Sequence, residues 1–220
     1  VTLMAGLQIS TAPTQEPLTL QEVKDYLRVE DSTDERIIRP YIETARRFAE
    51  EHLGRSLMTQ TITQFIDGYD EMEDPLFEGF RTGPYLTYYK NYITLARPPV
   101  VSVSSISTFN DEDTETTFAS TRYYLDNVRE PSRIVLRNGE TFPTALRVAN
   151  AIKIVYVSGY TSPFAIPEPI RLGMLQHIAH LYEHRGDMYS AQAYPPSMQK
   201  LYAPYVVMKG LYSNSLLSVG

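Results

Sequence analysis

The period of the hydrophobic pattern changes twice along this chain of 220 residues, and that change constrains the fold more than any single motif. Near both ends the apolar residues recur every three to four positions, which is typical of amphipathic helices. Between residues 59 and 160 the period falls to two, which is typical of strands with one buried face. The sequence therefore predicts an α+β fold in which the N- and C-terminal segments form a helical bundle and an antiparallel β region is inserted between them.

Two capping signals mark the starts of the N-terminal helices. The segment Thr19-Leu-Gln-Glu22 is a capping box, and Ser32-Thr-Asp-Glu35 repeats the pattern directly downstream. The second helix carries an apolar stripe that ends at Gly54, and Pro40 interrupts it. Because proline cannot donate a backbone hydrogen bond, we expect it to kink this helix or to split it.

The central region holds short runs of alternating apolar and polar residues, separated by turn residues. The clearest predicted strands are 93–95, 101–103, 133–136 and 152–157. The segment 67–92 is acidic first and then rich in tyrosine, so we expect a long loop or arm there. The predicted divisions are an N-terminal extension 1–16, helical parts 17–58 and 161–205, a β insert 59–160 and a C-terminal tail 206–220.

One catalytic motif lies on the helix predicted after residue 166. His180-Leu-Tyr-Glu-His184 has the H-x-x-E-H spacing of inverted zinc peptidases, in which the histidines bind zinc and the glutamate, here Glu183, handles the proton. Such a site needs a third ligand, and Asp187 is the only acidic residue after Glu183. We therefore expect buried or interface histidines, with His177 on the same helix face, and a zinc metallohydrolase stays as an alternative.

Charge and composition bear on partners. The chain holds 20 Lys and Arg against 26 Asp and Glu, and this net charge of −6 argues against a protein that grips a phosphate backbone. A DNA-binding packaging factor is a second alternative, but the helical arginines alternate with acidic residues, which is typical of an exposed salt-bridged face. These arginines are Arg28, Arg36, Arg39, Arg46 and Arg47.

Other features of the composition bear on the partners and cofactors that the protein could have. The chain has 17 tyrosines and no tryptophan, which favours large and partly wet protein–protein surfaces. It has no cysteine for a thiolate metal site and no glycine-rich phosphate loop, so we expect no cofactor. No apolar run approaches the ~20 residues that a membrane span needs, so we expect no membrane partner.

The order of many short segments resembles the head-tail connector, or adaptor, family of tailed phages, which also occurs in prophages and gene-transfer particles. The first pieces are 18–27, 43–48 and 53–57. Similar pieces follow at 93–106, 124–126, 130–136, 155–160, 166–171, 180–185 and 201–205. The resemblance therefore covers about residues 18–205.

The resemblance implies a structural, non-enzymatic virion subunit. Connectors of this family form a homo-oligomeric ring, commonly of about twelve copies, beneath the portal protein, and receive the stopper or tail-completion protein on the other face. DNA passes through the channel without specific binding. The implied location is the head–tail junction, after synthesis in the cytoplasm of a bacterial host.

Two sets of residues are the predicted contact sites. We expect the C-terminal tail to become ordered against the portal through apolar anchors. The anchors are Leu211, Tyr212, Leu216 and Leu217. Candidates for contacts with a neighbouring subunit or the tail are Tyr85, Tyr88, Tyr89, Tyr92, His177, His180 and His184.

Overall fold

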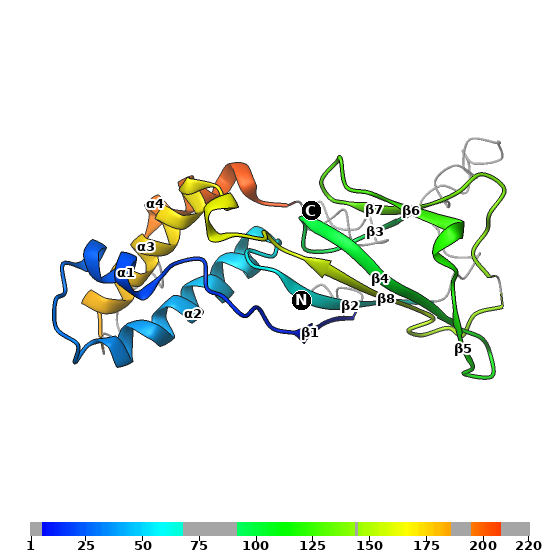
Figure 1. The fold of residues 1–220 in the computed structure, drawn as a ribbon, viewed down its shortest axis with the longest axis horizontal. Coiled ribbons are helices and arrows are strands. Elements are labelled where there is room, and N and C mark those ends of the chain that lie inside the picture. Colours follow the sequence, from blue (N-terminus) through cyan, green and yellow to red (C-terminus); the bar gives the residue numbers. More distant parts are fainter. Residues whose placement is uncertain (1–5, 68–91, 144, 186–194, 208–220) are drawn as a thin grey trace, which may run out of the picture. The chain divides into compact units, whose positions relative to one another are not determined.

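The computed structural model describes residues 6–67, 92–143, 145–185 and 195–207, which fall into two compact units (Figure 1). The β unit contains residues 6–12 and Gln60–Ser158, and the helical unit contains Pro13–Thr59 together with residues 159–207. The described residues form helices and antiparallel sheets, which confirms the predicted α+β class.

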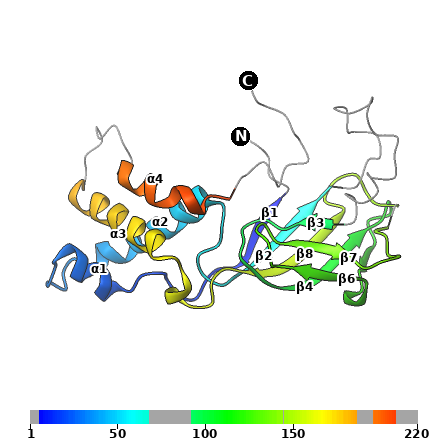
Figure 2. The same cartoon turned by 90° about the horizontal axis from the view of Figure 1, so that it is seen from above.

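The helical unit contains four α-helices within the described residues. They are α1 (Leu20–Leu27), α2 (Glu35–Leu53), α3 (Glu168–Glu183) and α4 (Pro196–Tyr202), with the short 3-10 turns η4 (Pro163–Ala165) and η5 (Ala203–Tyr205). Both views show α3 lying alongside α2 and α4 (Figure 1 and Figure 2). None of the described helices has both the length and the apolar character required to cross a bilayer.

The start of α1 matches the sequence prediction. Thr19 is the N-cap residue, and its hydroxyl accepts a hydrogen bond from the Glu22 amide at 3.2 Å. The Glu22 carboxylate in turn accepts one from the Thr19 amide at 2.7 Å, which completes the capping box. This reciprocal pair satisfies two of the amides that a helix start leaves without partners.

The start of α2 differs from its prediction. Asp34 is the N-cap residue and no side chain caps the helix, so the capping box predicted for Ser32–Glu35 is wrong. The carboxylate of Asp31 instead accepts hydrogen bonds from the amide and hydroxyl of Thr33, at 2.9 and 2.8 Å. This local turn competes with the capping geometry, as short polar side chains commonly do.

Pro40 lies inside α2, which continues without interruption from Glu35 to Leu53. The expected split is therefore absent. Ile38 and Ile42 on either side of the proline are both buried in the same core. Their packing holds the turns before and after the proline on one helical path, which offsets the missing hydrogen bond.

The core of the helical unit joins residues from both ends of the chain. Buried side chains of α1 and α2 pack with those of α3 and α4, including Val23, Leu53, Met174 and Tyr202. Gly173 lets α3 and α4 approach each other closely, because a Cβ atom there would lie 2.3 Å from Cε1 of Tyr202. The N- and C-terminal helices therefore form one bundle, as the hydrophobic periods predict.

The β unit contains two antiparallel sheets within the described residues. Strands β1 (Leu7–Thr11), β2 (Gln60–Ile66), β8 (Ile152–Ser158), β4 (Val100–Phe109) and β5 (Glu115–Thr117) form one sheet in this order. The smaller sheet has the order β3 (Tyr92–Thr94), β7 (Arg133–Leu136) and β6 (Tyr123–Asp126), which follows the 3-10 turn η3 (Ser120–Arg122). The sequence prediction missed β1, which lies in the expected N-terminal extension and pairs with β2.

The core of the β unit lies between these two sheets. Ile62, Ile106 and Ile154 of the larger sheet share one apolar cluster with Ile93 and Ile134 of the smaller one. A buried polar link crosses the same layer. The Gln64 side chain accepts a hydrogen bond from the Ala96 amide at 3.0 Å and one from the Tyr156 hydroxyl at 3.3 Å. This satisfied network fixes the loop after β3 on the larger sheet.

Candidate functional site

Most of the predicted contact residues lie outside the described part of the chain. This holds for Tyr85, Tyr88 and Tyr89 of the 67–92 segment and for Leu211, Tyr212, Leu216 and Leu217 of the tail. Tyr92 is the first residue of β3 and is partly exposed. The three histidines lie on α3 and at its C-terminal cap.

The histidine row has one buried and two more accessible members. His177 is 3% exposed, and its ring meets that of Phe48 from α2 edge to face at 4.8 Å. Burial, and secondarily the charge of His180, lowers the pKa of His177 to about 4. His180 is partly exposed and His184 is exposed, and their rings lie 4.3 Å apart.

The residues of the H-x-x-E-H motif do not form a metal site within the described part of the chain. The Nδ1 atom of His184 lies 2.9 Å from the carbonyl oxygen of His180, so it is engaged along the helix. No group of three or more His, Asp or Glu side chains within the described ranges has an arrangement that suits a metal ion. Residue Asp187 lies outside those ranges. The interface role of His180 and His184 stays a prediction.

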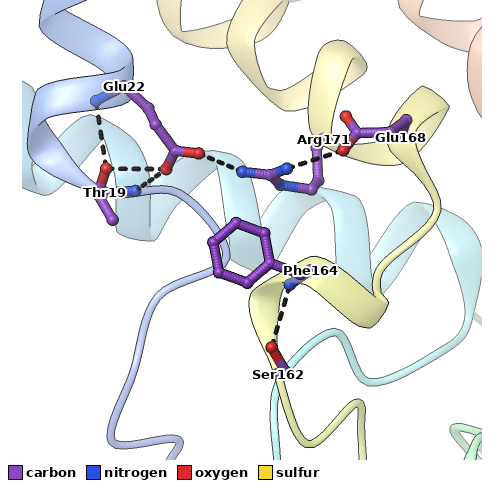
Figure 3. A network of polar contacts seen from close by, with 6 residues as sticks. All are labelled: Thr19, Glu22, Ser162, Phe164, Glu168 and Arg171. Atoms are coloured by element: carbon purple, nitrogen blue, oxygen red, sulfur yellow. Dashed lines mark hydrogen bonds and ion pairs between the residues drawn. The ribbon is translucent and has the colours of Figure 1, made fainter.

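A network of charged groups joins α1 to α3 (Figure 3). The guanidinium of Arg171 contacts Glu22, the glutamate of the α1 capping box, and donates to Glu168 at 2.9 Å. Burial raises the pKa of Glu22, but the hydrogen bonds from Thr19 and the charge of Arg171 outweigh it and leave the pKa lowered. Arg171 is only 8% exposed, so this contact fixes α3 against the start of α1.

An exposed aromatic ring lies beside this network (Figure 3). Phe164 is 83% exposed, and its ring centroid lies 5.7 Å from the guanidinium carbon of Arg171. The Ser162 hydroxyl accepts a hydrogen bond from the Phe164 amide at 3.3 Å, which caps the η4 turn. A large apolar group held at the surface in a fixed turn is available for a partner.

Arg46 forms a second buried network and corrects the sequence analysis. Its guanidinium binds both carboxylate oxygens of Glu16, at 2.8 and 3.2 Å, and donates to Glu50 at 3.2 Å. Glu50 also accepts a hydrogen bond from the Leu57 amide at 2.9 Å. Arg46 is 6% exposed, so it does not belong to the exposed salt-bridged face. By contrast, Arg47 is exposed and pairs with Glu43 one turn earlier, as predicted.

Charge alternation along α2 does not predict the role of Arg46, because its main partner lies 30 residues away, in the segment before α1. Alternation of charges along a helix predicts only pairs one turn apart. The nearest signal in the sequence is that Arg46 follows Ala45 of the apolar stripe and sits next to its edge. Only the folded structure shows that the stripe is wide enough to bury it.

The C-terminal segment is anchored where α2 ends. Arg55 donates to the carbonyl oxygen of Tyr205 at 3.0 Å and to the hydroxyl of Tyr160 at 3.1 Å. The amide of Val207 donates to the carbonyl oxygen of Leu53 at 2.8 Å, and its side chain is buried. The predicted tail therefore begins from a fixed point on the helical unit, and residues 208–220 lie outside the description.

Comparison with known families gives a match at the N-terminal part of the chain. Residues 17–81 match the family described as phage gp6-like head-tail connector protein. This match confirms the resemblance to head-tail connectors. No curated protein sequence matches the chain.

Chains in solved structures of gene-transfer-agent particles share the fold over nearly the whole chain. A chain in the neck of an empty GTA particle, computed with C6 symmetry, is 18% identical with a TM-score of 0.69, covering 91% of this chain and 94% of that one. A chain in the virion of a native gene transfer agent is 18% identical with a TM-score of 0.67, covering 90% and 94%. A third, in the neck of a native GTA particle computed with C12 symmetry, is 20% identical with a TM-score of 0.65, covering 91% and 94%. At these identities the likeness establishes the fold.

Proposed function

We propose that the protein is a structural head–tail connector subunit, which forms a ring beneath the portal and joins a DNA-filled capsid to its stopper or tail. The observation that carries this proposal is the combination of the connector family match with a fold shared across 91% of the chain with a particle neck protein. The role is architectural, with no chemical step. The working location is the head–tail junction of a virion or gene-transfer particle, after synthesis in a bacterial cytoplasm.

The symmetry of the similar structures supports a number of copies for the proposed ring. Their necks were computed with C6 and C12 symmetry, and both agree with a ring of twelve copies. Each subunit then makes two heterologous contacts, one with each neighbour. The two charged networks of Arg171 and Arg46 keep the helical unit rigid, as a repeated ring subunit requires.

The proposed channel passes DNA without holding it. Each copy carries a net charge of −6, so a ring multiplies negative charge around the passage. Screening limits this repulsion to ~8 Å at physiological salt. Binding to DNA that falls steeply with added salt would instead support the packaging-factor alternative.

The C-terminal tail is the proposed portal contact. Val207 fixes the point from which the tail leaves the helical unit. Beyond it, the sequence places the four apolar anchors Leu211, Tyr212, Leu216 and Leu217. Burying large apolar side chains contributes about 1.5–3 kcal/mol each before ordering costs, and a ring multiplies that gain.

Negative-stain microscopy with the cognate portal tests the proposal. We expect rings on the tail-facing end of the portal for the full chain and their loss for a chain that ends at Val207, which keeps the anchor to Leu53. A control chain with four serines at the anchor positions separates the apolar side chains from tail length. Rings that form equally well without the tail would refute the docking role, and absence of rings with any portal would refute the connector role.

A further inference from the structure

The smaller sheet has one face in the core and one face outside it. Ile93 and Ile134 point into the apolar cluster shared with the larger sheet. The residues that alternate with them form two cross-strand rows. The first row is Tyr92, Val135 and Tyr124, and the second is Thr94, Arg133 and Asp126, each in direct register across the three strands. We call these six residues the outer face.

The side chains of the outer face are held in place before any partner arrives. Arg133 donates to Asp126 at 2.8 Å, and its guanidinium carbon lies 5.1 Å from the centroid of the Tyr92 ring. Arg137, just beyond β7, lies 5.9 Å from the ring centroid of Tyr124, which is 47% exposed. Tyrosine and arginine dominate binding hot spots, and fixed side chains reduce the ordering cost of association.

The outer face itself is neutral, but exposed arginines lie beside it on this acidic chain. Asp126 neutralises Arg133, whereas Arg137 is exposed and has no carboxylate partner among the described residues. Arg129, in the turn after β6, is also exposed. Two copies that met through this face would oppose their own arginines. The contact therefore favours a different, acidic surface of the second copy, which makes it heterologous and able to close a ring.

An acidic turn in the same unit supplies the complement. The Asn110 side chain accepts hydrogen bonds from the amides of Glu112 and Thr114, at 3.0 and 2.8 Å, and so fixes the turn between β4 and β5. Asp111 and Glu112 are exposed and form no ion pair within the described part of the chain. Figure 1 shows this turn and the strands β6 and β7 at opposite margins of the β unit.

We propose that the outer face, together with Arg137, binds the acidic turn at Asp111 and Glu112 of a second copy of this chain. The inference deepens the proposed function, on which it rests, by naming a contact between ring neighbours. The tyrosines supply apolar area at its centre, and the charges set which surfaces meet. Because both surfaces belong to one β unit at separate margins, each copy uses one for each neighbour.

The absence of cysteine from the chain allows a clean cross-linking test. Val128, which is 96% exposed and two residues beyond Asp126, marks the outer face, and Asp111 marks the acidic turn. We expect V128C and D111C proteins to form a disulfide-linked dimer when mixed under mild oxidation, whereas neither forms one alone. The double variant is expected to give a ladder of oligomers. V128C mixed with T44C, a cysteine at an exposed α2 position, serves as the matched control.

Charge reversal gives an independent readout. We expect R137E to weaken self-association about tenfold, and the pair D111K and E112K to do the same. Combining all three substitutions in one chain restores the opposite charges across the contact, so we expect association to recover. Recovery supports the contact, whereas equal loss in the combined variant overturns it.

The outcomes separate this inference from the proposed function. Rings on the portal without V128C–D111C cross-links would overturn the contact and leave the connector role standing. Cross-links between copies that never attach to a portal would support the contact and refute the connector role. A V128C protein that links to the T44C protein as readily as to the D111C protein would place the neighbour on another surface and overturn the inference.

Discussion

Replacing Gly173 by alanine tests whether the close packing of α3 and α4 governs the stability of the helical unit. An added Cβ atom would lie 2.3 Å from Cε1, 2.9 Å from Cζ and 3.1 Å from Cδ1 of Tyr202. The Tyr202 ring is fully buried, so it cannot move aside without displacing the core. Overpacking of this kind costs about 1–3 kcal/mol, whereas alanine gains about 1 kcal/mol over glycine in a helix interior.

A double-mutant cycle isolates the clash. Because a 2.3 Å contact calls for the upper part of the overpacking range, about 2–3 kcal/mol, we expect G173A to lower the free energy of unfolding of the wild type by about 1–2 kcal/mol. In a Y202L background the ring is gone, so the same substitution should be neutral or stabilising by up to about 1 kcal/mol. The expected coupling energy between the two positions is therefore about 2 kcal/mol, within the range of contacting residues.

Urea unfolding followed by far-ultraviolet circular dichroism measures these differences, because the helical unit dominates the signal at 222 nm. T44A, at an exposed position of α2, is the control and should change stability by only a few tenths of a kcal/mol. A G173A protein as stable as the wild type, or one equally destabilised in both backgrounds, would show that Tyr202 does not constrain this position.

Three further predictions follow from the charged and titrating groups. R46A should lower the free energy of unfolding by about 3 kcal/mol, because it removes an ion-pair partner of the buried Glu50. R47A, at an exposed pair, should lower it by less than about 0.5 kcal/mol. Chemical denaturation of the two variants measures both differences. The pKa of His177 is lowered to about 4 in the folded protein. Between pH 6.5 and 4 the unfolded state therefore binds more protons than the folded state, and the free energy of unfolding should fall by up to about 3 kcal/mol as the pH is lowered through this range. H177L should flatten that part of the pH–stability curve. The lowered pKa of Glu22 stabilises the fold above pH 4.5 and the effect disappears as the pH falls, so E22Q should cost about 1 kcal/mol at pH 7 and nothing in strong acid.

Much of the fold was predictable because local patterns agree with the tertiary result. The Thr19 capping box fixes the start of α1, and the runs at 133–136 and 152–157 became β7 and β8. Predictions failed where a local pattern had a competitor. The box before α2 lost to the Asp31 turn, and Pro40 did not split its helix because buried residues flank it. β1 escaped detection because its alternating run, Leu7-Gln-Ile-Ser10, is short and its partner strand β2 is distant in the sequence.

For the function as well, part of the result was predictable from the sequence and part required the folded structure. Composition and segment order alone pointed to an assembly protein, and the resemblance to connectors needed no coordinates. Which residues meet was decided by the folded chain. Arg46 reaches Glu16 across 30 residues, and Arg171 reaches Glu22 across 149.

Hydrophobic period, capping residues and net charge are local or additive properties, so they were enough to predict a helical region, then a strand-rich region, then a second helical region, and the acidic balance of this protein. That Tyr92, Val135 and Tyr124 share one row is visible only in the folded chain. These residues come from strands separated by loops of differing length, and their neighbourhood depends on strand pairing and register. The same holds for His177, since burial against Phe48 sets its pKa and no spacing along α3 reveals that neighbour.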